Sequence, residues 1–162
     1  MRDLNGESLN AVLGGLYKRL NRTDEAIEAY KAAELVTPQN SYPIVNLATL
    51  YYLSGDPEQA KQYYERSVTI SARKLEVNPF DYWTRFDLSA AQLVLGNLEQ
   101  AKRQFNLATP YVRHVGPLET FLHDLERLKD APTSPKGVDE LVDLVRKSIE
   151  RVHSSPNWHT GA

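Results

Sequence analysis

The chain has 162 residues and a formal net charge of −2, with 41% hydrophobic and 25% charged residues. This composition argues against intrinsic disorder, and the near-neutral charge disfavours nucleic acid, whose general binders are usually basic. No window approaches the roughly 18 to 20 continuous apolar residues of a membrane span, and the first seven residues form no apolar signal core. We therefore expect a cytoplasmic protein without a membrane anchor. The absence of cysteine excludes disulfides, thiolate metal sites and a cysteine nucleophile.

Residues 41–79 predict two helices joined by a tight turn. An apolar stripe at helical spacing runs along the first helix and stops at a Gly-Asp-Pro turn. Asp56 suits the N-cap of the second helix, and Pro57 suits its first position, where a missing N–H costs nothing. The second helix is expected to end before Asn78-Pro79. Each helix keeps an apolar stripe that its partner cannot cover alone, so the pair needs neighbours.

The same pattern recurs on both sides of this segment. Five series of matching residues step first by 34 and then by 41 positions, and Tyr17 and Tyr51 share the first step. The five series are Leu13, Leu47 and Leu88; Gly14, Ala48 and Ser89; Ala26, Ala60 and Ala101; Tyr30, Tyr64 and Phe105; and Ala33, Ser67 and Ala108. Shared spacings at independent positions indicate an internal structural repeat.

These residues resemble the tetratricopeptide repeat family, which places apolar, small and aromatic residues on a first helix and Ala, aromatic and Ala on a second. The resemblance implies an all-α fold, a right-handed α-solenoid of antiparallel helix pairs, with repeats at about 7–40, 41–81 and 82–115. The second repeat is seven residues longer, which is about two helical turns. Its second helix should therefore be two turns longer, and we expect the C-terminal helices to cover the extension.

Beyond the third repeat, the helical periodicity continues while the repeat pattern fades. Segments 117–130 and 138–153 each carry apolar residues on one face and are expected to form a degenerate capping pair, because a terminal repeat needs a polar outer surface. Residues 1–153 are thus predicted to form one domain. A short polar tail at 154–162 is expected to be flexible.

No pattern in the chain indicates catalysis, a cofactor or a metal site. The histidines lack the spacing of three or four that brings ligands together on a helix. The pair Gly14-Gly15 lies inside a helical pattern, where the resemblance makes Gly14 a packing residue rather than part of a phosphate loop. The basic cluster Lys18, Arg19 and Arg22 is interpreted as a solvated helix end. We therefore predict that the chain is not an enzyme.

The resemblance also implies a binding surface, because first helices of this family line a concave groove that holds a peptide. The candidate groove residues are Tyr42, Val45, Asn46, Thr49, Tyr52, Trp83, Phe86, Asp87 and Leu93. Of the basic and amide residues that chaperone-binding members use to grip a C-terminal carboxylate, only Asn46 is present, and Asp87 would repel a carboxylate. The remaining aromatic residues predict a groove for a peptide or an amphipathic helix.

Two other functions remain open at this stage. The apolar face could instead mediate homodimerisation of a self-assembling structural module, and the groove could be filled by the last helix or by a second copy. A nucleic-acid-binding helical repeat is a weaker alternative, since the charge disfavours it. The sequence identifies no particular protein partner.

Overall fold

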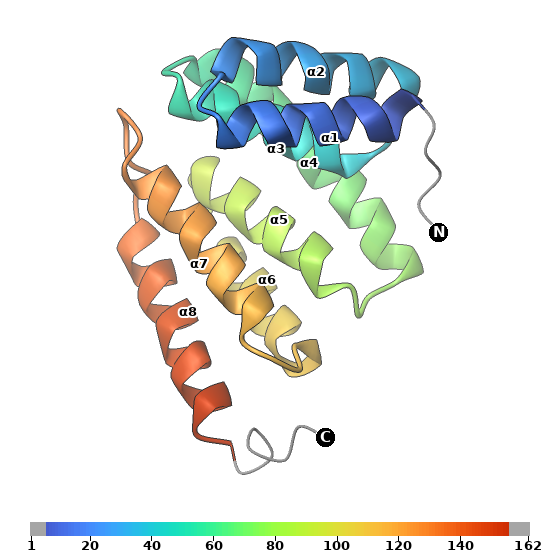
Figure 1. Ribbon diagram of the computed structural model, residues 1–162. Coiled ribbons are helices and arrows are strands. Elements are labelled where there is room, and N and C mark those ends of the chain that lie inside the picture. Colours follow the sequence, from blue (N-terminus) through green and yellow to red (C-terminus); the bar gives the residue numbers. More distant parts are fainter. Residues whose placement is uncertain (1–5, 156–162) are drawn as a thin grey trace. The chain divides into compact units, whose positions relative to one another are not determined.

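The computed structural model describes residues 6–155, and within them the chain folds into eight α-helices and one short 3-10 helix (Figure 1). The helices are α1 (Gly6–Arg19), α2 (Thr23–Val36), α3 (Ser41–Leu53), α4 (Pro57–Val77), α5 (Tyr82–Val94), α6 (Leu98–Ala108), η1 (Thr109–Tyr111), α7 (Gly116–Lys129) and α8 (Val138–His153). The predicted all-α class is confirmed, whereas the right-handed twist of the array stays a prediction. Most of the predicted polar tail, from residue 156 on, lies outside the described residues.

Several helices that are neighbours in the chain pack on one another, and the repeat boundaries stay a prediction. Helix α1 packs on α2, α5 on α6, and α7 on α8, and α2 also packs on α3. The matched positions of the repeat are the buried ones. At the alanine position and the aromatic position of the second helix, all three repeats place side chains that are at most 1% exposed: Ala26, Ala60, Ala101, Tyr30, Tyr64 and Phe105. The repeated residues thus form the contacts that hold each pair together.

Gly14 lets the first two helices approach closely. A Cβ atom added to Gly14 would come within 2.8 to 2.9 Å of the Tyr30 ring, a distance that real Cβ contacts do not show. The expectation that Gly14 is a packing residue is therefore confirmed. In the third repeat the equivalent Ser89 is also buried, and its hydroxyl donates to the Ala101 carbonyl at 2.8 Å.

Each repeat turns between its two helices through one residue with left-handed backbone geometry. These residues are Asn21 (φ 56°), Gly55 (φ 82°) and Gly96 (φ 86°), and they repeat the steps of 34 and 41 positions. Glycine adopts this geometry without steric cost, and asparagine tolerates it better than most other residues. The turns therefore follow the same repeat spacing as the buried positions.

Helix α4 is the long helix that the sequence predicts. It has 21 residues against 14 in α2, a difference of seven, and so the two-turn extension is confirmed. Its N-terminus is capped as expected, since the Asp56 carboxylate accepts a hydrogen bond from the Gln59 amide at 3.2 Å. The extension is not covered at its end, however, because Val77 is 88% exposed.

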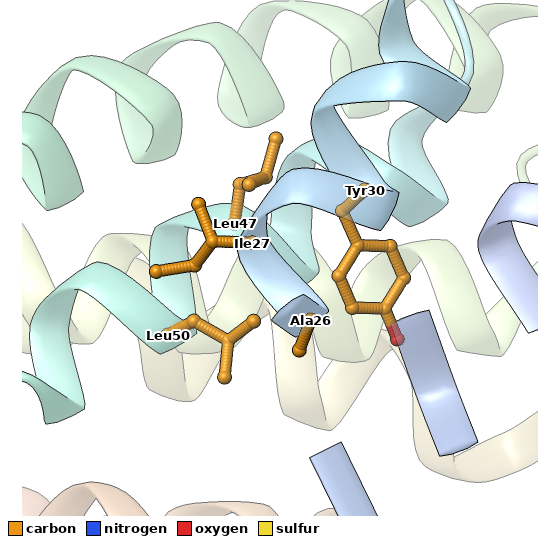
Figure 2. Close-up of a cluster of buried hydrophobic side chains, with 5 residues drawn as sticks. All are labelled: Ala26, Ile27, Tyr30, Leu47 and Leu50. Carbon is orange, nitrogen blue, oxygen red and sulfur yellow. The ribbon is translucent and has the colours of Figure 1, made fainter. Parts of the chain in front are cut away.

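The chain forms two compact units that divide within α4, between Ile70 and Ser71. The expectation of one domain over residues 1–153 stays a prediction. Unit 1 holds α1, α2, α3 and the first part of α4, and unit 2 holds the rest. Figure 2 shows the apolar core of unit 1, to which α2 contributes Ala26, Ile27 and Tyr30 and α3 contributes Leu47 and Leu50.

Unit 2 is built on a stack of aromatic rings and on its C-terminal helix pair. Phe86 of α5 lies parallel to Phe121 of α7 with ring centroids 4.8 Å apart, and Phe105 of α6 stacks on both. Helix α8 packs on α7 and α6 and buries Val138, Leu141, Val142 and Val145. The last helix therefore uses its apolar face inside unit 2, as a capping helix would.

Candidate peptide-binding surfaces

In unit 1, α3 presents an exposed tyrosine in its first turn. The Asn40 side chain caps α3 by accepting a hydrogen bond from the Tyr42 amide at 3.0 Å, which fixes where the helix begins. The Tyr42 ring meets the Tyr30 ring edge-on, with centroids 6.0 Å apart, yet 49% of Tyr42 is exposed. A Cβ atom on Gly15 would lie only 3.8 Å from the Tyr42 hydroxyl. Tyr42 is thus held in place from behind while one side of it stays accessible.

One turn further along α3, an amide group links α3 to α1. The Asn46 side chain donates to the Tyr42 carbonyl at 2.8 Å, and its oxygen accepts a hydrogen bond from Lys18 Nζ, also at 2.8 Å. Both residues are partly exposed. Because the two hydrogen bonds fix the amide orientation, a polar ligand would meet a preformed amide beside an ammonium group and an aromatic ring.

The same stripe continues over the next two turns of α3. The Thr49 hydroxyl donates to the Val45 carbonyl at 3.0 Å and lies 3.2 Å from the Tyr64 hydroxyl. Tyr52 meets the Tyr64 ring edge-on at 6.5 Å, and partial burial raises the pKa of its phenol. All three of Val45, Thr49 and Tyr52 are half-buried. We call Tyr42, Val45, Asn46, Thr49, Tyr52 and Lys18 together the α3 surface.

Unit 2 carries a second exposed aromatic residue near the start of α5. The Asp81 carboxylate caps α5 by accepting from the Thr84 amide at 3.1 Å. Trp83 follows in the first turn, 47% exposed, and contacts the Tyr82 ring at 5.5 Å and the Phe86 ring at 6.1 Å. Trp83 therefore offers unit 2 a large, supported aromatic contact.

The other groove residues predicted in unit 2 have different surroundings. Phe86 is 2% exposed and Leu93 is also buried. Phe86 forms the centre of the ring stack, so it contributes to the stability of unit 2 rather than to its accessible surface. Asp87 keeps part of its surface exposed, yet burial raises the pKa of its carboxyl to about 7. Sequence periodicity could not distinguish the exposed Trp83 from the buried Phe86 and Leu93, because buried and half-exposed residues alternate on the same helix.

Lys18 is not among the candidate groove residues, although the family resemblance places it in the groove lining. It belongs to the basic cluster that was interpreted as a solvated helix end, and this interpretation suits Arg22, which pairs with exposed Glu25 at 2.7 Å. Lys18 instead reaches across to Asn46. The available signal was its place late in a first helix, which the resemblance assigns to the groove lining.

A separate cleft of about 720 Å³ lies within unit 2, between the η1 region and α8. It is lined by the apolar residues Val112 and Leu118 and by the basic residues Arg113, His114 and Arg151, among others. None of the candidate groove residues predicted from the sequence lines this cleft.

Two other kinds of site are absent from residues 6–155. No group of three or more His, Asp or Glu side chains in that range is arranged to hold a metal ion. No described helix is both long enough and apolar enough to cross a membrane.

The paired helices, the small residue under an aromatic ring and the repeated turns define a protein built from helical-hairpin repeats. Residues 8–40 and 44–74 match the tetratricopeptide repeat family, and these two segments are therefore assigned to it. Repeats of this family generally mediate protein–protein interactions, and the proteins that carry them are typically non-catalytic. No curated protein matches the chain.

Proposed function

We propose that this chain is a non-catalytic interaction module that binds a peptide or an amphipathic helix of a partner protein on the α3 surface. Trp83 on unit 2 is a second contact for protein partners. A partner peptide would insert an apolar side chain beside the Tyr42 ring and place a polar group near Asn46 and Lys18.

The observation that carries this proposal is the environment of Tyr42. Aromatic side chains are frequent anchors of binding energy, because they provide large contact areas at a small cost in side-chain entropy. Tyr42 is half-exposed but supported by the Tyr30 ring and by α1. Preorganised support of this kind reduces the ordering cost of binding. Lys18 and Asn46 next to it supply polar groups that can fix the orientation of a peptide.

The proposal is tested with peptides selected from a random display library against the intact chain. The affinity of the selected peptides is then measured by calorimetry for the wild type, for Tyr42→Ala and for Tyr111→Ala. Tyr111 is the matched control, since it is also an exposed tyrosine that contacts one other ring, that of Phe80 at 5.0 Å. We expect Tyr42→Ala to weaken binding at least tenfold and Tyr111→Ala to change it less than twofold.

Two results would contradict the proposal. A library that yields no specific peptide would argue against a peptide-binding module, and equal effects of the two tyrosine substitutions would argue against the α3 surface. The Trp83 contact is tested separately with Trp83→Ala, because Phe86→Ala would remove a core ring and confuse binding with unfolding.

A further inference from the structure

Helix α1 also carries exposed apolar residues that are not part of the α3 surface. Leu9, Val12 and Leu16 are 60%, 57% and 42% exposed, and Leu20 just beyond the helix is 65% exposed. Their spacings of three, four and four residues place them on one helical face. We call Leu9, Val12 and Leu16 the α1 apolar face. Isolated exposed leucines are ordinary, whereas a continuous exposed stripe marks a surface that another protein segment covers.

The repeat itself indicates what covers such a face. Moving by one repeat, or 34 residues, takes Leu9 to Pro43, Val12 to Asn46 and Leu16 to Leu50 on α3. Pro43 and Leu50 are buried, with Leu50 only 3% exposed, whereas Asn46 is partly exposed. Leu50 packs in the unit 1 core with Ala26, Ile27 and Tyr30 of α2 (Figure 2). At Leu50, the equivalent of Leu16, α3 is therefore covered by the second helix of the preceding repeat.

The covering helix has a definite chemistry. Helix α2 contributes a small residue, a branched apolar residue and an aromatic residue to the cluster that it shares with α3, namely Ala26, Ile27 and Tyr30. The Tyr30 ring also lies against Gly14 of α1. It is 14 residues long, the same as α1. Leucines at the equivalent positions of α1 keep the apolar character of the contact, but their exposure shows that they lack the covering helix among the described residues.

We infer that the α1 apolar face binds an amphipathic helix of a partner protein in the position that α2 takes on α3. The partner helix presents a small, a branched apolar and an aromatic side chain at positions i, i+1 and i+4. This binding is independent of the α3 surface, because the two surfaces use different residues of unit 1. A partner could therefore extend the helical array from its α1 side.

The probe for this inference is a synthetic peptide with the α2 sequence, residues 23–36. Its ends are blocked, and a lactam bridge on its polar face holds it helical, because an isolated helix of this length is marginal in water. The peptide is titrated into the intact chain with labelled Leu and Val methyl groups. We expect saturable shifts of the Leu9, Val12 and Leu16 methyl signals.

Three variants of the chain test which residues the peptide contacts. Leu16→Lys should weaken binding at least tenfold, whereas Leu35→Lys, which changes an equally large exposed leucine on α2, should leave it unchanged. Tyr42→Ala should also leave it unchanged, which separates this surface from the α3 surface. A peptide with lysine in place of Ile27 should not bind. All three chain variants alter exposed positions, and thermal melts check that they stay folded.

Several outcomes would overturn the inference. These are the absence of saturable shifts, shifts confined to the Leu47 and Leu50 methyl groups, and binding that survives Leu16→Lys. Sedimentation of the free chain provides a further check. A dimer that Leu16→Lys converts to a monomer would assign the α1 apolar face to a second copy of this chain instead of a partner helix.

Discussion

At the scale of single residues, two adjacent glycines on α1 have opposite roles. Gly14 leaves no room for a methyl group, because an added Cβ would lie 2.8 Å from the Tyr30 ring. Gly15 leaves enough room, since its nearest neighbours would lie 3.7 and 3.8 Å away. Replacing each glycine by alanine therefore separates the effect of packing on stability from the effect of helix propensity.

Gly14→Ala should destabilise the protein by about 1 to 3 kcal/mol, the usual cost of overpacking a tight contact. Gly15→Ala should be neutral or stabilising by up to about 1 kcal/mol, because alanine is the better helix former. Urea denaturation followed by circular dichroism measures both. Equal effects of the two substitutions would show that the contact between Gly14 and Tyr30 does not limit the approach of α1 and α2.

Asp87 gives the protein a specific pH dependence. Burial raises the pKa of its carboxyl to about 7; Lys74 opposes this shift, and Asp124 and Asp81 add to it. In the unfolded chain the carboxyl ionises near pH 4. Between about pH 4 and 7 the folded chain holds a proton that the unfolded chain has lost. The contribution of Asp87 to stability therefore falls as the pH rises through this window.

Asp87→Asn should remove this contribution to the pH dependence. The free energy of unfolding of the variant minus that of the wild type should grow from pH 5 to pH 8. Asp143→Asn, which changes an exposed carboxylate on α8, is the control and should give a difference that stays nearly constant. A constant difference for Asp87→Asn as well would show that its carboxyl is already ionised at pH 5.

At the scale of elements, the caps differ between equivalent helices. Asp56 caps α4 through a hydrogen bond from the Gln59 amide, whereas Asn97, which is 41 residues later and precedes α6, makes no such bond. Asp56→Ala should cost about 1 kcal/mol of stability, the typical loss of a side-chain cap. Asn97→Ala should cost clearly less, and thermal melts of both variants compare them. A larger loss from Asn97→Ala would contradict this account of the caps.

Element boundaries and pairing could be predicted from the sequence, because they rest on local chemistry. The Gly-Asp-Pro turn, the apolar stripes and the seven extra residues each fix a helix end or a length without knowledge of distant contacts. The environment of Phe86 could not be predicted in this way. Its burial depends on Phe121, which lies 35 residues away on α7 and outside the three repeats. A face predicted from one helix does not reveal which distant ring will cover it.

The accessibility of the residues proposed for binding could also be predicted only in part. Tyr42 and Trp83 were proposed from their repeat positions, and both are half-exposed aromatic residues in first turns. The hydrogen bond from Lys18 to Asn46 could not be predicted, because it spans two helices, and charge patterns along one helix cannot report such a contact. The exposure of the α1 leucines could not be predicted either, because an apolar stripe in a sequence predicts burial.

At the scale of the whole molecule, the repeat pattern and the compact units do not coincide. The pattern is regular from residue 7 to about 115, but the units divide inside α4, in the middle of the second repeat. The apolar stripe of α4 continues past this point, so the sequence gives no sign of the division. Family similarity covers residues 8–40 and 44–74, which is most of unit 1 and the first four residues of unit 2.

The central claim is that the α3 surface binds a peptide, and chemical-shift mapping tests it most directly. A selected peptide is titrated into the isotopically labelled intact chain, and the backbone amide signals are followed. We predict saturable shifts that are largest at Tyr42, Asn46 and Thr49, together with a shift of the Lys18 amide. Saturable shifts that leave these four residues unchanged and fall elsewhere, for instance around the cleft at Arg113 and Arg151, would contradict the claim.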